Sequence, residues 1–342
     1  MAGTKKVAVA MSGGVDSSLT AALLIQRGFE VIGVTMILSD TGEITDAEKV
    51  AAQLGIAHYV ADFRAEFRAE IEDYFVAEYL RGRTPNPCVR CNKLIKFGRL
   101  FEFAENLGAE FLATGHYARV EFERGRYRLK KALDVRKDQS YVLYNLTAEK
   151  LSRIMLPLGE FTKAETRAIA EELKIIVAHK KDSQEICFIP NDDYKSFLEN
   201  RAEDADALTA GEIADTAGRV LGEHEGVANY TIGQRKGLGI AAPEPLYVLR
   251  LDVKNRRVIV GSNAETFASG LMAEEVHWIY EPEYPARLQC KIRYGPRVAD
   301  CTVYENMRVE FDEPQRAVTA GQSVVFYDGE EVLGGGIIAG TL

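Results

Sequence analysis

The hydrophobic pattern of the first part of the chain alternates between two periods. The runs VAVAM (7–11) and VIGVTMIL (31–38) are continuous and rich in β-branched residues, which is typical of strands buried on both faces of a parallel sheet. The segment between them, 17–27, has apolar residues at helical spacing. The sequence therefore predicts a βαβ unit at its start.

The same alternation continues to about residue 205. The pattern predicts further helices at 46–54, 65–80 and 94–106, further strands at 58–63 and 111–115, a hairpin turn at Arg124-Gly125, and a helix that the capping box of Thr162 and Glu165 opens and that ends near residue 173. We expect an α/β domain with a parallel sheet over residues 1–205.

The pattern changes beyond an acidic stretch at 199–208 that is low in large apolar residues. Short alternating strands follow, separated by Gly, Pro, Asp and Asn, at 247–253, 257–261, 288–294, 308–311 and 323–328. Such strands are typical of small β modules. With a further boundary near Ser269-Gly270, we expect a small central domain at 206–269 and a C-terminal β-domain at 270–342.

Length and composition are consistent with this division and exclude some classes of protein. A chain of 342 residues is long enough for two or three domains. Its longest apolar runs fall short of the roughly 18 residues needed to cross a bilayer, which excludes a membrane-spanning protein. The start MAGTKK leads directly into the first strand without an export signal, so we expect a cytoplasmic protein.

The charge is distributed unevenly. A net charge of −9 argues against a protein that coats nucleic acid by bulk charge. Yet 81–99 contains six basic residues and no acid, and 124–137 contains seven basic residues against Asp134 alone. We expect these two basic runs to offer a confined positive surface to phosphates.

The motif SGGVDS (12–17) follows the first strand and opens the first helix. Paired glycines let backbone amides approach an anion, the helix N-terminus adds partial positive charge, and Ser12 and Ser17 add hydroxyl groups. The loop lacks the Lys of a Walker-type motif and the spacing of a dinucleotide-binding one. It predicts a phosphate cradle in which Asp16 suits Mg²⁺ bound to pyrophosphate.

Five cysteines are a small and odd number, which argues against a disulfide framework. Their placement is therefore more informative than their number. The pair in NPCVRCN (86–92) suits a redox couple or half of a metal site, and we expect Arg90 and Lys93 to lower the pKa of its thiols. Taken alone, Cys187 would be a buried strand thiol. Cys290 and Cys301 fit strand interiors, and we assign them no chemistry.

Three further motifs place polar residues in loops. TGHYA (114–118) ends a strand at the edge where open α/β sheets bind ligands, so His116 is expected to face the cleft and Gly115 to let a nucleotide approach closely. KDQSY (137–141) and GQRKGLGI (233–240) combine basic, amide and glycine residues as phosphate-gripping loops do.

These motifs, in the order SGGVDS, NPCVRCNKLIKF, ATGHYAR, KDQSYVL, SQEICFI and YTIGQRKGLGI, resemble those of the bacterial tRNA-uridine 2-sulfurtransferases, or tRNA-specific 2-thiouridylases. The resemblance spans nearly the whole chain. It implies an N-terminal ATP-pyrophosphatase domain of the PP-loop, adenine nucleotide alpha hydrolase-like type, a small central domain and a C-terminal β-barrel.

The resemblance also implies an activity. The enzyme would 2-thiolate the wobble uridine of tRNA(Lys), tRNA(Glu) and tRNA(Gln), by adenylating the C2 oxygen with ATP and Mg²⁺ and then transferring sulfur from a cysteine persulfide. A sulfur-donor relay protein or a cysteine desulfurase would supply the sulfur. The sequence does not reveal which donor serves it or whether the chain forms oligomers.

Site residues follow from the positions that match. ATP would be bound by Ala10, Met11, Ser12, Gly13, Gly14, Val15, Asp16, Ser17, Met36 and Gly115. Cys187 would carry the persulfide, and Cys91 would act as the nucleophile that leaves a Cys91–Cys187 disulfide. The target base would contact Asn86, Pro87 and Cys88, and the rest of the tRNA would contact His116, Lys137, Asp138, Gln139, Arg293, Tyr294 and Gln322.

The chain departs from the family pattern at Cys88, where many members carry Asp, and in a shorter segment after Met36. As an alternative to the persulfide, a [4Fe–4S] cluster with one open iron for sulfide could be held by Cys88, Cys91 and Cys187. Of the two routes, we favour the persulfide. Two rival functions are an adenylating amide ligase of the same superfamily, which leaves Cys91 and Cys187 without a role, and a non-catalytic tRNA- or nucleotide-binding module.

Overall fold

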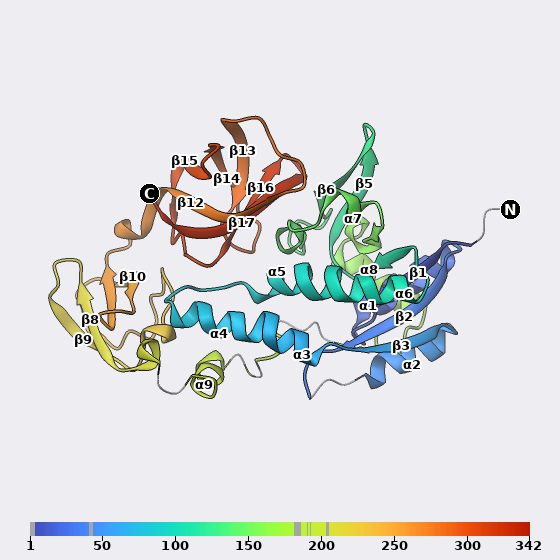
Figure 1. The fold of residues 1–342 in the computed structure, drawn as a ribbon, viewed down its shortest axis with the longest axis horizontal. Helices are drawn as coiled ribbons and strands as arrows, with labels where there is room; N and C mark the ends of the chain where they lie inside the picture. The colour runs from blue at the N-terminus through green and yellow to red at the C-terminus, as the bar shows by residue number, and fades with distance from the viewer. Residues whose placement is uncertain (1–3, 41–43, 181–185, 190, 192, 203–204) are drawn as a thin grey trace.

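The computed structural model describes residues 4–40, 44–180, 186–189, 191, 193–202 and 205–342. Three β-sheets organise these residues, one for each part of the chain that the sequence distinguishes. Figure 1 shows the parallel sheet at one end of an elongated molecule, the central domain at the opposite end, and a barrel beside the helices that run between them. The predicted fold class is therefore confirmed.

The N-terminal sheet has the order β3-β2-β1-β4-β7, and its recorded strand pairs are parallel. Its strands are β1 (Lys6–Ala10), β2 (Glu30–Ile37), β3 (Ala57–Asp62), β4 (Phe111–Ala113) and β7 (Ile154–Met155). The apolar runs of β1 and β2 are buried, as continuous β-branched runs predict.

Helices cover this sheet and extend away from it. They are α1 (Val15–Gln26), α2 (Thr45–Leu54), α3 (Arg64–Phe67), α4 (Asp73–Leu80), α5 (Pro87–Cys91), α6 (Leu100–Asn106), α7 (Ala148–Leu151), α8 (Lys163–Glu172) and α9 (Tyr194–Glu199), with π-helical segments η1 (Arg68–Glu72) and η2 (Asn92–Arg99) and 3-10 turns η3 (Ser140–Leu143), η4 (Pro157–Glu160), η6 (Asp206–Leu208), η7 (Val227–Asn229) and η8 (Ala264–Thr266). The predicted capping box of α8 is confirmed, since Thr162 and Glu165 bond each other's backbone N–H. No helix among the described residues has both the length and the apolar composition that crossing a membrane requires.

One predicted helix begins earlier than its hydrophobic pattern indicates. The sequence places its start at residue 94, but α5, η2 and α6 form one continuous helix from Pro87. Asn86 caps it by accepting a hydrogen bond from the Val89 N–H at 3.3 Å, and a proline at the first helical position is preorganised for the helix. The CxxC motif therefore lies on the first turn of this helix and not in a loop.

The central domain is a four-stranded sheet of order β10-β11-β8-β9. Its strands are β8 (Gly211–Asp215), β9 (Val220–His224), β10 (Tyr247–Asp252) and β11 (Arg257–Gly261). A small core that includes Ile213, Val248 and Val258 holds it together. The boundaries predicted at 205/206 and 269/270 stay predictions.

Six strands form the C-terminal barrel, which the pairing of β12 with β17 closes. They are β12 (Phe267–Trp278), β13 (Ala286–Lys291), β14 (Ala299–Val303), β15 (Arg308–Arg316), β16 (Ser323–Asp328) and β17 (Glu331–Thr341). The pattern of the sequence does not predict β17, because its Gly334-Gly335-Gly336 run is typical of a turn. In the barrel, a Cβ at each of these glycines would lie 2.3–2.7 Å from a neighbouring atom, so close packing requires them.

A hairpin of the N-terminal domain joins the barrel sheet. Its strands β5 (Ala118–Glu123) and β6 (Arg126–Lys131) turn at Arg124-Gly125 as predicted, and both turn residues have positive φ angles, 49° and 81°. In the backbone register of the sheet, Lys130 of β6 lies opposite Glu331 of β17. The barrel is therefore attached to the N-terminal domain through a shared sheet.

Candidate functional site

The phosphate loop lies between β1 and α1. Gly13 has a φ of 69°, and a Cβ there would lie 3.0 Å from the Asp46 Cβ and 3.1 Å from the Ala47 nitrogen. Gly14 precedes the helix and offers no side-chain cap, so the first N–H groups of α1 have no side-chain acceptor at that position. Backbone donors at the start of a 12-residue helix can therefore meet an anion.

The two serines of the loop have different roles. Ser17 is buried; its Oγ accepts a hydrogen bond from the Ser12 N–H at 3.2 Å and donates to the Gly14 carbonyl at 3.1 Å, which holds the loop in shape. Ser12 is exposed. The side chains of Met11 and Val15 are buried in the core, so these two residues could contact a phosphate only through their backbone.

Asp16 is held by two partners. Lys163 Nζ lies 2.8 Å from each carboxylate oxygen, and the Tyr117 hydroxyl donates to Oδ1 at 2.9 Å. The Asp16 side chain nonetheless keeps 31% of its surface exposed, beside the loop. Lys163 is not among the predicted site residues, because a lysine directly after a capping threonine belongs to no motif.

A second lysine contacts the loop from a later segment. Lys180 Nζ donates to Asp46 Oδ2 at 2.7 Å and to the Gly13 carbonyl at 3.3 Å. The hydrogen bond from Lys180, together with its charge, lowers the pKa of Asp46. Two ammonium groups, each paired with a carboxylate, therefore flank a loop that suits an anion.

The other residues expected at ATP lie at the same carboxyl edge of the sheet. Met36 is near the end of β2, beside β1. A Cβ on Gly115 would lie 2.9 Å from the Asp16 carbonyl carbon and 3.0 Å from the Ser17 nitrogen. Packing against the loop itself thus requires glycine at 115, and its contact with a nucleotide stays a prediction.

Cys91 differs from the thiol that the sequence predicts. It is only 6% exposed, and burial raises its pKa to about 12, opposed by the Lys96 ammonium. The expectation that Arg90 and Lys93 lower this pKa is wrong. Arg90 points elsewhere, donating to the Glu70 carbonyl at 2.8 Å and lying 4.2 Å from the Tyr74 ring centre, whereas Lys93 is exposed.

Cys187 has an exposed side chain and lies in a turn, so the alternative of a buried strand thiol is wrong. Partial desolvation raises its pKa, a Cys88 thiolate would raise it further, and Lys96 lowers it. Cys88 and Cys187 also raise the pKa of Cys91. The structure therefore brings Cys88, Cys91 and Cys187 into one electrostatic group with Lys96, although part of the SQEICFI motif, 183–185, lies outside the described residues.

Metal binding by the thiols is one of the alternatives that the sequence leaves open. Within the described parts of the chain, no three His, Cys, Asp or Glu side chains are gathered so that they could hold a metal ion. Cys91 is buried whereas Cys88 and Cys187 are exposed, and the iron–sulfur alternative stays a prediction. Asp16 supplies one carboxylate at the phosphate loop, which suits a Mg²⁺ ion held mainly by phosphates.

The barrel holds the segment that leads into the CxxC helix. The Gln322 amide donates to the Thr84 carbonyl at 2.8 Å and to the Pro85 carbonyl at 3.4 Å, and the Thr84 N–H donates to the Ala320 carbonyl at 2.9 Å. Pro87 is buried in the first turn of α5. Gln322, expected to contact tRNA, thus has a structural contact next to Asn86, and a tRNA contact stays a prediction.

Asp138 and Gln139 are tied into the protein. Asp138 is buried; its Oδ1 accepts from the Ala132 and Ser140 N–H groups at 3.1 Å, and its Oδ2 pairs with Lys291 at 2.7 Å. Gln139 exchanges two hydrogen bonds of 2.8 Å with the backbone of Tyr117. Both residues shape the loop that presents the half-buried Lys137, and their own contacts with tRNA stay predictions.

His116 is buried and not a cation. Its Nδ1 lies 2.7 Å from the Thr114 hydroxyl, its ring lies 5.9 Å from that of Phe97, and burial lowers its pKa well below the ordinary value. The expectation that it faces an open cleft is therefore wrong. A neutral imidazole could contact RNA through a hydrogen bond but not by charge.

Tyr294 is the exposed aromatic residue among those expected to contact tRNA. Half of its surface is exposed, its ring lies 6.2 Å from that of Tyr141, and burial with the charges of Asp138 and Cys88 raises its pKa. This coupling places Tyr294, from the barrel, near Cys88. Its neighbour Arg293 donates to the Arg316 carbonyl.

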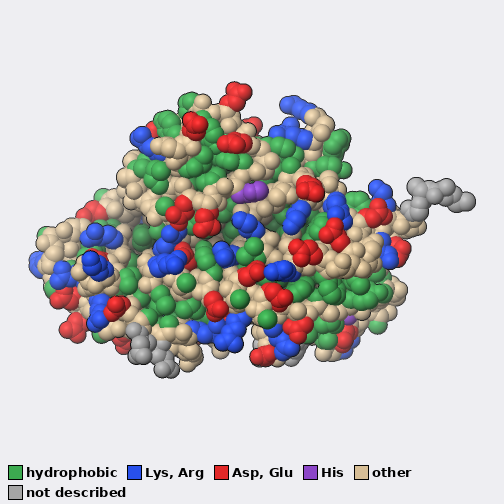
Figure 2. All heavy atoms as spheres, in the orientation of Figure 1, with side chains coloured by type: hydrophobic (Ala, Val, Ile, Leu, Met, Phe, Trp, Pro, Cys, Tyr) green, Lys and Arg blue, Asp and Glu red, His purple; other side chains and the backbone are tan. Residues whose placement is uncertain are grey.

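The second basic run is partly neutralised within the protein, since three of its seven basic residues form ion pairs with acids of neighbouring strands. Arg126 and Arg128 pair with the buried Glu331, and Lys130 pairs with Glu121 and Glu123. The acids come from β5 and β17, which the fold brings beside β6. Figure 2 likewise shows basic and acidic side chains intermixed on one face of the molecule.

The first basic run is only partly neutralised. Arg81 and Arg83 pair with Glu78, and Arg99 pairs with Glu70. Lys93 and Lys96 have no recorded ion pair with another described residue. These two lysines, on the helix that begins with the CxxC motif, are the part of the run that a phosphate could meet.

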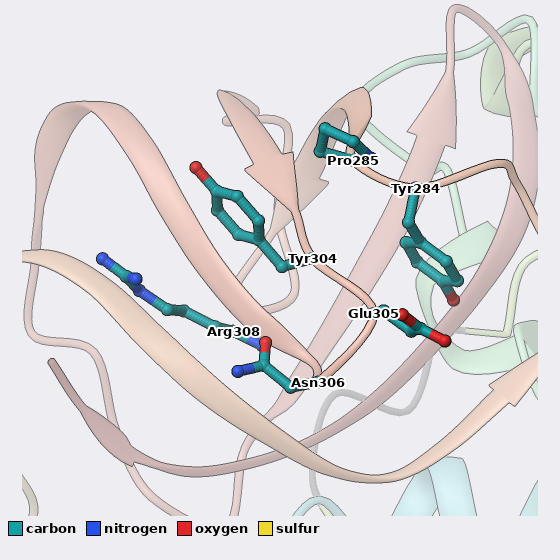
Figure 3. Close-up of a pocket in the computed structure, with 6 residues that line it drawn as sticks. All are labelled: Tyr284, Pro285, Tyr304, Glu305, Asn306 and Arg308. Atoms are coloured by element: carbon teal, nitrogen blue, oxygen red, sulfur yellow. The ribbon is translucent and has the colours of Figure 1, made fainter.

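Two cavities lie among the described residues, and neither contains all the predicted site residues. One of about 500 Å³ opens on the barrel, away from every expected site residue, and its lining includes Tyr284, Tyr304 and Arg308 (Figure 3). Another of about 30 Å³ lies between α5 and the barrel and includes Asn86 and Lys93 in its lining. The latter is on the scale of one or two waters and smaller than a nucleobase.

Comparison with known proteins gives three consecutive family matches. Residues 5–191 match a tRNA methyl transferase HUP domain, residues 195–262 a tRNA methyl transferase PRC-barrel domain, and residues 268–338 an aminomethyltransferase beta-barrel domain. Together they account for nearly all of the described chain.

Curated relatives are similar over their full length. The chain is 48% identical to the tRNA-specific 2-thiouridylase MnmA of Carboxydothermus hydrogenoformans, over 98% of both chains. It is 49% identical to that of Geobacter metallireducens, over 98% of this chain and 96% of the relative. Solved structures resemble it weakly: U34-tRNA thiolase NcsA from Methanococcus maripaludis aligns at 20% identity and a TM-score of 0.35 over 59% of this chain and 66% of that one, too little to carry an argument.

Proposed function

Because the chain belongs to the tRNA-specific 2-thiouridylase family, we propose that it replaces the C2 oxygen of the wobble uridine in tRNA(Lys), tRNA(Glu) and tRNA(Gln) with sulfur, at the expense of ATP. The observation that carries this proposal is identity near one half over 98% of the chain. The loop and the three thiols support it, because the reaction needs both an anion cradle and a sulfur carrier.

Activation of the base is the first step. The uridine C2 oxygen attacks the α-phosphorus of ATP, the bond from that phosphorus to the bridging oxygen breaks, pyrophosphate leaves, and the base loses its N3 proton. The N–H groups at the start of α1, with Lys163 and Lys180 beside them, would bind the phosphates. Asp16 would hold Mg²⁺, which when bound supplies charge to the departing pyrophosphate.

Sulfur transfer is the second step. The outer sulfur of a persulfide on Cys187 attacks C2, and AMP leaves with the C2–O bond electrons. Cys91 then attacks Cys187 Sγ and breaks the S–S bond, while its thiol proton passes to N3 of the base. The sulfur stays on C2, and a Cys91–Cys187 disulfide forms that a dithiol reductant resets. A sulfur-donor relay protein or a cysteine desulfurase would load the exposed Cys187.

The tRNA would approach from the side of Cys88. The cavity beside Asn86 is too small for a base, whereas Cys88 is exposed and Tyr294, half exposed, lies near it. An exposed aromatic ring is a suitable stacking surface for a base taken out of its loop. Lys93 and Lys96, on the same helix as Cys88, would bind nearby phosphates.

The family-model descriptions contain the words methyl transferase, whereas the curated relatives are thiouridylases. Methyl transfer would give Cys187 and the phosphate loop no shared role. Nucleoside mass spectrometry after incubation with unmodified tRNA, ATP and a sulfur source separates the two activities. We expect a mass gain of one sulfur for oxygen at a uridine; a methylated nucleoside, or no product, contradicts the proposal.

The sulfur route has its own test. Cys187→Ser and Cys91→Ser should still release pyrophosphate with tRNA present but yield no 2-thiouridine, because adenylation needs no thiol. Cys88→Ser should keep activity in metal-free protein. If anaerobically purified enzyme instead contains iron and acid-labile sulfide, and Cys88→Ser loses both together with activity, the persulfide route is wrong and the cluster takes its place.

A further inference from the structure

A loop of the central domain carries two basic residues that the proposed reaction does not use. Residues 231–239, TIGQRKGLG, precede β10 and contain no acid. Arg235 and Lys236 are exposed, and the described structure records no side-chain hydrogen bond or ion pair for either. Their charges are therefore available to a partner.

The loop is held in one shape. The Gly233 N–H donates to the Val248 carbonyl at 2.7 Å, and the Val248 N–H donates to the Gln234 carbonyl at 2.9 Å. The Gln234 side chain accepts from the Thr231 N–H and donates to the Lys236 carbonyl, both at 3.0 Å. Leu238 is buried in the core of the central domain. Fixed ends and a fixed turn lower the entropy lost when the charged side chains bind.

The loop lies where the three domains meet. A Cβ on Gly233 would lie 2.5 Å from the Ala317 Cβ at the end of β15, so the loop packs closely on the barrel. The Thr231 hydroxyl lies 3.3 Å from that of Thr84, in the N-terminal domain. Thr84 is four residues before Cys88, a separation of at most about 14 Å even for an extended chain.

We propose that Arg235 and Lys236 form a phosphate-binding site for the backbone of the same tRNA whose uridine reaches Cys88. The inference rests on the proposed function. A nucleic acid duplex carries about one charge per 1.7 Å of axis, so a tRNA with its base at Cys88 brings several phosphates within about 14 Å. Two cations on a rigid loop that contacts Thr84 bind phosphates of this tRNA and fix the direction in which it crosses the central domain.

The test measures binding of unmodified tRNA to the full chain at several salt concentrations. Arg235→Ala/Lys236→Ala is expected to raise Kd on the order of tenfold at low salt and to reduce the slope of log K against log salt by about 1.5, the value for two lost contacts. The matched control is Arg219→Ala on the β8–β9 turn, whose guanidinium is already paired with Asp215 at 3.0 Å. It should leave Kd and slope as in the wild type.

Several outcomes would overturn the inference. If the double variant has the wild-type Kd and slope, the loop is not a tRNA-binding site. If it also no longer accepts sulfur from the donor, the loop binds a protein instead. If the double variant unfolds, the single variants Arg235→Gln and Lys236→Gln replace it; each should reduce the slope by about half as much, and wild-type slopes from both overturn the inference. A wild-type chain that binds no tRNA contradicts the proposed function instead.

Discussion

Asp16 is the carboxylate of the phosphate loop, and its removal tests adenylation. Asp16→Ala takes away the partner of Lys163 and the oxygen that would hold Mg²⁺, so we expect tRNA-dependent pyrophosphate release to fall at least 100-fold while tRNA still binds. The measurement is pyrophosphate release with and without tRNA. Glu30→Gln, an exposed carboxylate paired with Lys6, is the control. Release near the wild-type rate from Asp16→Ala would mean that the loop does not bind the nucleotide.

Lys96 tests the electrostatic group of thiols. Since its ammonium lowers the pKa of both Cys91 and Cys187, Lys96→Ala should raise both pKa values and leave less thiolate at any given pH. We expect the pH midpoint for iodoacetamide alkylation of Cys187 to move upward, with several-fold slower labelling at pH 8. Mass spectrometry of the labelled peptide measures it.

The same alkylation experiment compares the reactivity of Cys91 with that of Cys187. Cys91 should resist alkylation at pH 8 in the folded wild type, because a pKa of about 12 leaves it protonated until the solution is strongly alkaline. Lys93→Ala, three residues away on the helix, should leave both midpoints unchanged. If Lys93→Ala shifts the midpoint of Cys187 as much as Lys96→Ala does, the assignment of Lys96 is wrong.

At the scale of elements, a close contact joins the barrel to the segment before α5. Gly321 has a φ of 90°, and a Cβ there would lie 2.9 Å from the Thr84 nitrogen. Gly321→Ala should cost about 1–3 kcal/mol for overpacking in addition to the strain of a positive φ. Urea unfolding measures the loss.

Gly329→Ala is the matched control for that substitution. Gly329 also has a positive φ, 59°, but nothing lies within 4 Å of a Cβ there, so only strain is expected, about 1–2 kcal/mol. Equal losses for the two variants would show that the barrel contact is not tight. A larger loss for Gly321→Ala, with slower thiolation, would show that the barrel positions the CxxC helix.

Whole-molecule stability depends on an ion pair between domains. Asp138 and Lys291, 3% exposed or less, join the loop after β6 to the barrel at 2.7 Å. Asp138→Asn leaves the lysine charge buried without its counterion, so we expect a loss of about 3–5 kcal/mol by urea unfolding.

The double variant Asp138→Asn/Lys291→Met should recover most of that loss, because it removes both charges. The pair of measurements separates the ion pair from simple disruption of packing. A double variant as unstable as the single one would show that the loop, and not the charge, is what the substitution damages.

The sequence by itself determined much of the local structure. Continuous β-branched runs gave β1 and β2, the Thr162–Glu165 box gave α8, and Arg124-Gly125 gave a turn, because each depends on neighbours along the chain. The glycines of SGGVDS gave the turn into α1 for the same reason, whereas binding of an anion there stays a prediction. A strand of glycines such as 334–336 was missed, since what requires glycine there is the atoms of other strands.

Only the tertiary structure decided the charge and exposure of the site residues. The fold pairs Arg126 and Arg128 of the second basic run with Glu331, 205 and 203 residues away in the chain. It also buries Cys91 and His116 and pairs Asp16 with Lys163. A pKa or an ion pair depends on every group within several ångströms, wherever it stands in the chain. The residue types of a site can therefore be found in its sequence, whereas their protonation and partners follow from packing.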